Sequence, residues 1–233
     1  MFRFKRFTIK QDRTPMKVGT DGVILGAWVN IYGEERRILD IGTGTSVIAL
    51  MMAQRSEASV DGVEIDEASA LQAAENVEAS PWSERVSIHH TEIQSYHPNE
   101  RYDLIVSNPP YFVDSLTSPD PGRTTARHTT QLSFTDLVNA VARLLEPDGR
   151  FAIILPTQES QLFDIQSHKK LHLHRRCNIH SREGGEVKRV MSEYKLKDNN
   201  TKIEPENLSI ERNKRHDYTD EYRKLTGDFY LKF

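Results

Sequence analysis

The sequence predicts an α/β fold in which a mostly parallel sheet is covered by helices on both faces. Between residues 36 and 156, short apolar segments alternate with helix-like segments, which is typical of parallel strands joined by right-handed crossovers. The continuously apolar run FAIIL, residues 151–155, suits a strand that is buried on both sides. The chain has 233 residues, of which 37% are hydrophobic and 28% are charged, so it is long enough for one large domain.

The elements are expected in three consecutive parts of this single domain. Residues 1–35 are expected to cap the sheet with a hairpin in FRFKRFTIKQD and a helix in DGVILGAWVNIY. The core, residues 36–156, is expected to hold strands at 36–41, 59–65, 85–90, 102–108 and 149–156, and helices at 45–55, 66–80 and 133–145. Residues 157–233 are expected to add alternating strands at 170–179 and 186–196, a polar loop at 197–207 and a short final helix. The result is a seven-stranded sheet with one antiparallel edge strand.

Composition limits the class of protein. Cys177 is the single cysteine, which excludes a disulfide framework and suits a reducing cytoplasm. No apolar run approaches the roughly 20 residues that span a bilayer, and the N-terminus lacks the apolar region of a signal peptide. We therefore expect a cytoplasmic protein without a membrane partner.

Charge and histidine patterns are less decisive. The formal net charge is −3, yet residues 1–17 and 165–182 are locally basic. Such stretches indicate contact with a polyanion at one face, or solvated edge strands with no partner. His168, His172 and His174 lack a cysteine or acid that would complete a metal site, so no metal is expected.

The stretch DIGTGTSVIALMMA, residues 40–53, joins the first core strand to the first core helix. Gly42 and Gly44 let the backbone approach a ligand closely, and the acid Glu64 follows Asp40 by 24 residues, at the end of the next strand. A carboxylate there can accept both hydroxyls of a ribose, which suits NAD and S-adenosylmethionine equally. A dinucleotide site needs a glycine where Val47 stands, whereas a methyl-donor turn needs one where Ser46 stands. Ser46 is the milder deviation, so the pattern favours a methyl donor over NAD or an ordinary turn.

The stretch VSNPPYF, residues 106–112, follows the fourth core strand and therefore lies on the same sheet edge. The exocyclic amine of adenine is a poor nucleophile because its lone pair is delocalised into the ring. The side-chain oxygen of Asn108 and the carbonyl of Pro109 can accept its two hydrogens, while Pro110 stiffens the loop. Tyr111 can stack on an extruded base. The sequence predicts methyl transfer to a planar amine, driven by positioning.

Together these motifs resemble the class I S-adenosylmethionine-dependent methyltransferases, which have a Rossmann-like fold. The resemblance covers Asp40, Gly42, Gly44, Glu64 and the run Asn108–Tyr111. In that family an acid after the third strand holds the adenine of the donor, which implies this role for Glu92, with Ile93 packed on the ring. Glu92 replaces the more usual aspartate.

Two further stretches resemble the bacterial tRNA adenine methyltransferases that modify valine tRNA next to the anticodon. They are FTIKQDRTPMKVGTDGVILGAW and NPPYFVDSLTSPDPGRTTARHTTQLSFTDLV. The resemblance implies N6-methylation of adenine 37 in the anticodon stem-loop by an enzyme expected to act as a monomer. It places Lys17, Thr20 and Asp21 near the amino-acid end of the donor, although Thr20 or Asp21 also suits a helix cap.

The stretch 112–130 follows the catalytic motif directly. Its basic residues Arg123, Arg127 and His128 either hold phosphates of a single-stranded loop or are ordinary loop residues.

Other functions stay open at this stage. A release-factor glutamine methyltransferase shares the Asn-Pro-Pro-Tyr loop but carries a helical N-terminal domain, for which too few residues precede the first core strand. A DNA adenine methyltransferase needs additional length to read its target. A guanine-amine rRNA methyltransferase and a non-catalytic RNA-binding protein on the same fold are further alternatives.

Overall fold

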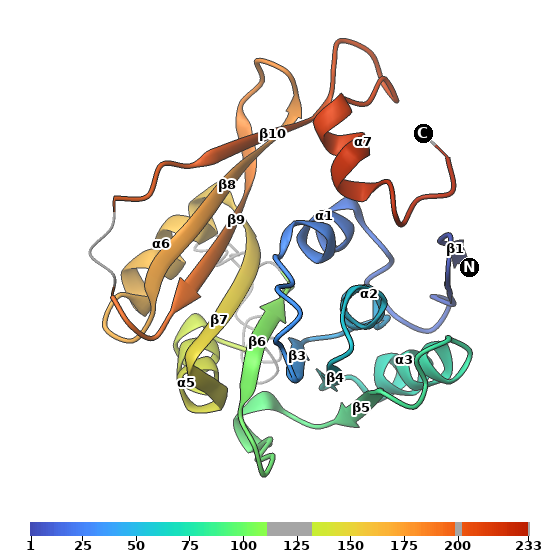
Figure 1. Cartoon of the computed structure of the whole chain (residues 1–233), viewed down its shortest axis with the longest axis vertical. Coiled ribbons are helices and arrows are strands. Elements are labelled where there is room, and N and C mark those ends of the chain that lie inside the picture. The colour runs from blue at the N-terminus through green and yellow to red at the C-terminus, as the bar shows by residue number, and fades with distance from the viewer. Residues whose placement is uncertain (111–131, 199–201, 233) are drawn as a thin grey trace, which may run out of the picture.

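A computed structural model of the chain describes residues 1–110, 132–198 and 202–232 (Figure 1). Within those residues, the main sheet has eight strands in the order β10-β8-β9-β7-β6-β3-β4-β5. The strands are β3 (Arg37–Ile41), β4 (Ser59–Glu64), β5 (Val86–His90), β6 (Tyr102–Ser107), β7 (Leu145–Pro156), β8 (His172–Arg182), β9 (Val187–Lys195) and β10 (Glu206–Glu211). A separate antiparallel pair, β1 (Phe2–Arg3) and β2 (Thr8–Ile9), forms the expected N-terminal hairpin.

Helices cover both faces of this sheet. On one side lie α1 (Thr20–Trp28), α2 (Val47–Arg55) and α3 (Glu67–Glu78), and on the other lie α5 (Phe134–Leu144) and α6 (Thr157–Ser167) (Figure 1). Neighbouring strand residues alternate between the two cores: Ile38 packs with the α1–α2 side, while Leu39 packs with the α5–α6 side. Strands β3, β6 and β7 therefore bury both faces, as a parallel sheet between two helical layers requires.

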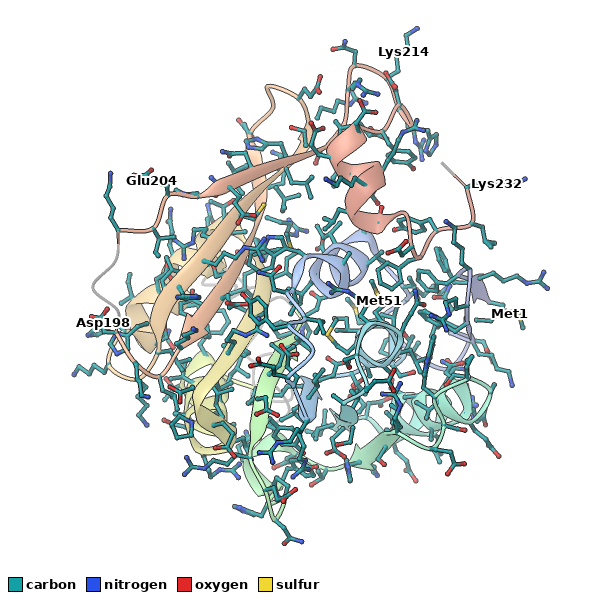
Figure 2. The ribbon with its side chains drawn as sticks, viewed as in Figure 1. Met1, Met51, Asp198, Glu204, Lys214 and Lys232 are labelled. Carbon is teal, nitrogen blue, oxygen red and sulfur yellow. The ribbon has the colours of Figure 1, made fainter. Side chains whose placement is uncertain are left out.

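The last helix, α7 (Asp220–Thr226), packs against α1, and the chain ends meet beside it. Phe4 forms an isolated antiparallel bridge with Tyr230, so the two termini lie on the same side of the molecule (Figure 1). Met51 of α2 is fully buried beneath α1, whereas Lys214 and Lys232 extend from the periphery (Figure 2).

The fold class is confirmed, but the details of the C-terminal part differ from the prediction. The main sheet has eight described strands rather than seven, because ENLSIE forms β10 and pairs in parallel with β8. The antiparallel strand is β9, which lies between β7 and β8 and not at an edge. Helix α6 was not predicted; it follows Pro156, has no side-chain cap and buries only Ser160, Phe163 and Ser167, so its apolar pattern is weak.

Candidate active site

A cavity of about 380 Å³ opens at the carboxyl ends of the central parallel strands. It is lined by residues that follow β3, β4, β5 and β6, together with the segment that precedes α1. This is the edge at which open α/β sheets bind their ligands. Most of the residues predicted for the donor and reacting sites line it: Lys17, Gly42, Gly44, Glu64, Glu92, Ile93, Asn108, Pro109 and Pro110.

The turn after β3 presents backbone to this cavity. Gly42 and Gly44 have φ angles of +71° and +54°, a left-handed conformation in which side chains are disfavoured. Apart from Gly42 itself and its two chain neighbours, no residue has an atom within 4 Å of the position that a Cβ of Gly42 would occupy. The N–H groups of Gly42 and Thr43 donate to the carbonyl of Val63 at 2.9 and 3.1 Å, which fixes the turn against β4.

Ser46 does not contact the cavity. Its side chain is fully buried and its hydroxyl donates to the carbonyls of Thr45 and Ala73. Its φ is +65°, so this position too has the backbone that favours glycine. Ser46 stands at the N-cap position of α2, but its hydroxyl is held by those carbonyls and makes no hydrogen bond to the start of the helix.

Asp40 lies behind the turn and is not among the residues that line the cavity. One of its oxygens accepts hydrogen bonds from the Thr43 hydroxyl at 2.7 Å and from the N–H of Ala49 at 3.1 Å. Burial raises the pKa of this carboxyl to about 7. Asp40 therefore links the glycine turn to the first residues of α2 on the side away from the cavity.

Two carboxylates face the cavity. Glu64 accepts hydrogen bonds from the N–H groups of Gly44 and Asp66, both at 2.9 Å. Glu92 is exposed and makes no side-chain cap to the short helix η1 (Ile93–Ser95). Ile93 beside it is buried and apolar. The cavity therefore has one carboxylate at the turn, a second beside an apolar wall, and backbone that a ligand can approach closely. These features fit a nucleoside that carries hydroxyls, a planar base and a positive charge.

Asn108 follows β6 and faces the same cavity as the turn. Its Nδ2 lies 3.6 Å from the position that a Cβ of Gly22 would occupy, so the glycine leaves room for the amide beside α1. The Ser107 hydroxyl donates to the carbonyl of Ile41 at 2.9 Å, which joins the ends of β6 and β3. The reacting motif and the donor turn are therefore held on two directly paired strands.

Sequence reasoning missed how the segment before α1 is held. Gln72 and Asn76 of α3 are fully buried, and their amides bind its backbone: Asn76 pairs with Lys10 at 2.8 and 2.9 Å, and Gln72 accepts from the N–H of Arg13 at 3.0 Å. Two amide residues four apart on the buried face of a helix were the available signal. They position residues 14–19, which form one wall of the cavity.

Some predicted residues lie elsewhere. Thr20 and Asp21 line a neighbouring cavity, and Asp21 forms an ion pair with Arg189 of β9 at 2.8 Å. Four predicted residues lie outside the described ranges, namely Tyr111, Arg123, Arg127 and His128. Cys177 is buried, and burial raises the pKa of its thiol to about 12, as expected of a packing residue.

The described residues offer neither a metal site nor a membrane-spanning helix. Across residues 1–110, 132–198 and 202–232, no three histidine, cysteine, aspartate or glutamate side chains are grouped as metal ligands. None of the helices described is long and apolar enough to cross a membrane.

Comparison with solved structures agrees with this architecture. A predicted O-methyltransferase from Agrobacterium tumefaciens matches with a TM-score of 0.70 at 18% identity, covering 90% of this chain and 96% of that one. The glycopeptide N-methyltransferase MtfA, solved in complex with S-adenosylmethionine, matches with a TM-score of 0.54 at 13% identity over 78% of this chain and 90% of that one. These likenesses show the class I methyltransferase fold.

Sequence comparison is more specific. The family model for the methyltransferase small domain matches residues 24–162. The tRNA1(Val) (adenine(37)-N6)-methyltransferases of Bacteroides thetaiotaomicron and Phocaeicola vulgatus are 45% and 46% identical to this chain, each covering 99% of it and 97% of their own length. The enzyme of the same name from Trichodesmium erythraeum is 45% identical over 100% of this chain and 98% of its own. The chain belongs to the methyltransferase small-domain family and to the family of these relatives, the bacterial tRNA1(Val) (adenine(37)-N6)-methyltransferases.

Proposed function

We propose that this protein transfers the methyl group of S-adenosylmethionine to the N6 amine of adenine 37 in valine tRNA. The observation that carries the proposal is the single cavity shared by the Gly42–Gly44 turn, Glu64 and Asn108. Donor and acceptor groups can meet there without any movement of the sheet. The names of the close relatives support the same substrate.

The residues of this cavity suit the methyl donor, which supplies a methyl group already activated on a sulfonium. Gly42 and Gly44 give the amino-acid portion access to backbone, and Glu64 offers oxygen lone pairs to the ribose hydroxyls. Glu92 and Ile93 hold the adenine through its amine and its face. Lys17 lines the same cavity from the segment before α1, and we propose that it contacts the donor carboxylate.

The acceptor side uses the loop after β6. We propose that the Asn108 side-chain oxygen and the Pro109 carbonyl accept the two hydrogens of the adenine amine. Both acceptors are held in place, because prolines restrict the loop and Ser107 fixes its start. The nitrogen lone pair is then directed at the methyl group; an N–C bond forms as the S–C bond breaks, and the surplus amine proton leaves to solvent. This requires positioning and no strong base.

The anticodon loop suits this site because its bases are unpaired and can be extruded at little cost. We propose that the enzyme acts on this loop as a monomer. With tRNA as substrate, the site of action is the cytoplasm.

The test is transfer of labelled methyl groups to total tRNA from a strain that lacks the gene, followed by nucleoside analysis and mapping of the modified position. We expect N6-methyladenosine at position 37 of valine tRNA. Asn108→Ala should lower transfer at least about a hundredfold and leave binding of S-adenosylhomocysteine unchanged. Asn99→Ala, at an exposed position, is the matched control. Label in protein with unmodified tRNA would contradict the proposal.

A further inference from the structure

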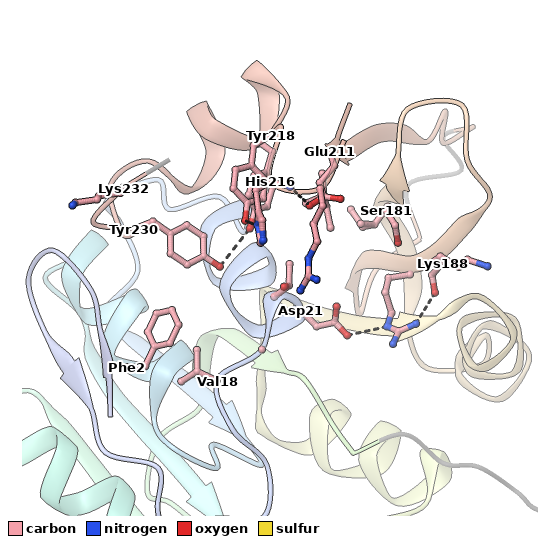
Figure 3. Close-up of a pocket in the computed structure, with 17 residues that line it drawn as sticks. Phe2, Val18, Asp21, Ser181, Lys188, Glu211, His216, Tyr218, Tyr230 and Lys232 are labelled. Atoms are coloured by element: carbon pink, nitrogen blue, oxygen red, sulfur yellow. Dashed lines mark hydrogen bonds and ion pairs between the residues drawn. The ribbon is translucent and has the colours of Figure 1, made fainter. Parts of the chain in front are cut away.

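A second cavity, of about 780 Å³, adjoins the donor cavity (Figure 3). It lies between the start of α1, the ends of β8, β9 and β10, and the segments that flank α7. Val18 and Gly19 line both cavities, so the segment that enters α1 is their shared wall. An RNA strand that lies along this wall can therefore reach both cavities.

The described residues that line the second cavity carry an excess of positive charge. The lining includes four cations and two acids, namely Lys188, Arg189, Arg215 and Lys232, and Asp21 and Glu211. Both acids already have partners: Asp21 pairs with Arg189 at 2.8 Å, and Glu211 pairs with Arg182 at 3.7 Å.

The remaining cations are available to a ligand. Lys188 is 57% exposed, and its one ion pair among the described residues is with the exposed Glu186, at 2.8 Å. Arg215 and Lys232 are exposed, and neither has an ion-pair partner among residues 1–110, 132–198 and 202–232. Three cations on separate segments therefore line one hollow, with Lys188 and Lys232 at its outer edges (Figure 3).

The two basic stretches of the sequence behave differently. In the stretch 165–182, Arg175 pairs with Glu206 at 2.7 Å and Arg176 with Asp164 at 2.7 Å. In the N-terminal stretch, Arg13 pairs with Glu75. These three cations stabilise the fold, whereas Lys188, Arg215 and Lys232 line the second cavity with most of their charge unneutralised.

Aromatic rings accompany this charge. Phe2 and Tyr230 lie on one wall with ring centroids 6.3 Å apart, and His216 and Tyr218 lie on another, 6.1 Å apart (Figure 3). His216 is exposed and has a φ of +66°, which is strained for a residue with a side chain. The backbone N–H of His216 donates to the Glu211 carboxylate at 2.7 Å, and the ring Nδ1 lies 3.1 Å from the Tyr218 hydroxyl. The strained loop thus holds an imidazole at the cavity.

We propose that the second cavity binds the nucleotide next to the target adenine in single-stranded RNA. Its phosphate contacts Arg215 and Lys232, with Lys188 at the rim, and its base stacks on the rings of His216 and Tyr218. A positive groove combined with aromatic faces is the usual means of holding an unpaired strand. The inference rests on the proposed function, since it assigns the RNA a path from this cavity, over Val18 and Gly19, to Asn108.

The charge part is tested with the full-length double variant R215A/K232A and an anticodon stem-loop of valine tRNA as the probe. We expect about tenfold weaker RNA binding and a correspondingly higher KM, with kcat at saturating RNA and the affinity for S-adenosylhomocysteine unchanged. The slope of log affinity against log salt should fall by about 1 to 2. The control K169A/K197A removes two exposed lysines that do not line the cavity, and it should bind RNA like the parent.

The ring part is tested with His216→Gly, which removes the imidazole and also the strained φ. We expect an unchanged or higher Tm together with RNA binding at least about fivefold weaker. A purely structural role for His216 would not give that combination. If the parent methylates tRNA while R215A/K232A matches its control in KM and salt slope, the second cavity is not an RNA site, although the proposed function stands. If the parent transfers no methyl group to tRNA, the proposed function itself is overturned.

Discussion

One carboxylate oxygen of Glu64 accepts a hydrogen bond from the backbone N–H of Gly44, 2.9 Å away, across the space between β4 and the turn after β3. The other oxygen accepts from the N–H of Asp66 at 2.9 Å. A carboxylate has about four acceptor positions, so two remain for a ligand. Glu64 therefore shapes the glycine turn and can bind the ribose of the donor at the same time.

Glu64→Gln should weaken donor binding. The amide retains one acceptor oxygen but turns an NH₂ group toward one of the two backbone N–H groups. We expect the affinity for S-adenosylhomocysteine to fall at least tenfold, and the free energy of unfolding to drop by about 1–2 kcal/mol. Calorimetric titration and urea unfolding measure the two effects. Glu78→Gln, on the exposed side of α3, is the control; unchanged affinity in Glu64→Gln would exclude Glu64 as a donor ligand.

Ser46→Gly should be tolerated. Glycine relieves a left-handed backbone that costs a residue with a side chain about 1 kcal/mol, while the more flexible unfolded chain and the lost hydroxyl contacts offset that gain. We expect the free energy of unfolding to change by less than about 1 kcal/mol and donor affinity to stay within twofold. The same titration and unfolding experiments apply. A tenfold loss of affinity would show that the hydroxyl serves the ligand, contrary to its buried position.

The parallel core could be predicted from the sequence because its signals are local. Strands β3 and β4 are short runs that are each followed by a helical pattern, and the Gly42–Gly44 turn and the Asn108 loop follow their strands directly. Since parallel strands end at one edge of the sheet, the two motifs had to meet there.

Other features depend on partners far away in the sequence. Asp21 is fixed by Arg189, 168 residues later, and this pairing turns it to the second cavity. The position of β9 between β7 and β8 follows from which strands it pairs with, which its own alternating pattern does not specify. The left-handed backbone of Ser46 is visible in the sequence only as a departure from an expected glycine.

Gly62→Ala should disturb the Gly42–Gly44 turn by displacing Thr43, against which Gly62 packs. A Cβ at this position of β4 would lie 2.8 Å from Cδ1 of Ile88 and 3.0 Å from both Cγ2 and Oγ1 of Thr43. Moving Thr43 displaces a residue that hydrogen bonds to Asp40 and precedes Gly44. We expect the free energy of unfolding to fall by about 1–3 kcal/mol, with weaker binding of S-adenosylhomocysteine. Ser59→Ala, at the exposed start of the same strand, should change neither quantity. Parent-like affinity in Gly62→Ala would show that the turn does not depend on this packing.

Asp40 should make stability depend on pH in the direction opposite to that of a salt-bridged acid. Its pKa is about 7 in the folded chain and 3.8 in the unfolded chain, because burial disfavours the charged form. Between these values the folded state holds a proton that the unfolded state has released, so this group lowers stability progressively as the pH rises from 4 to 7. Below pH 4 both states are protonated and the effect disappears.

Asp40→Asn keeps an oxygen that accepts from Thr43 and Ala49 but carries no charge. The stability of the variant relative to the parent should therefore increase with pH between 4 and 7, by up to about 4 kcal/mol. Urea unfolding of both proteins at several pH values measures this difference directly. The control for the general effect of removing a carboxylate is Asp103→Asn. The Oδ2 of Asp103 accepts hydrogen bonds from the backbone N–H groups of Arg36 and Arg37 near the surface. A difference between Asp40→Asn and the parent that does not change with pH would mean that Asp40 is ionised throughout, with the turn rather than a proton neutralising its charge.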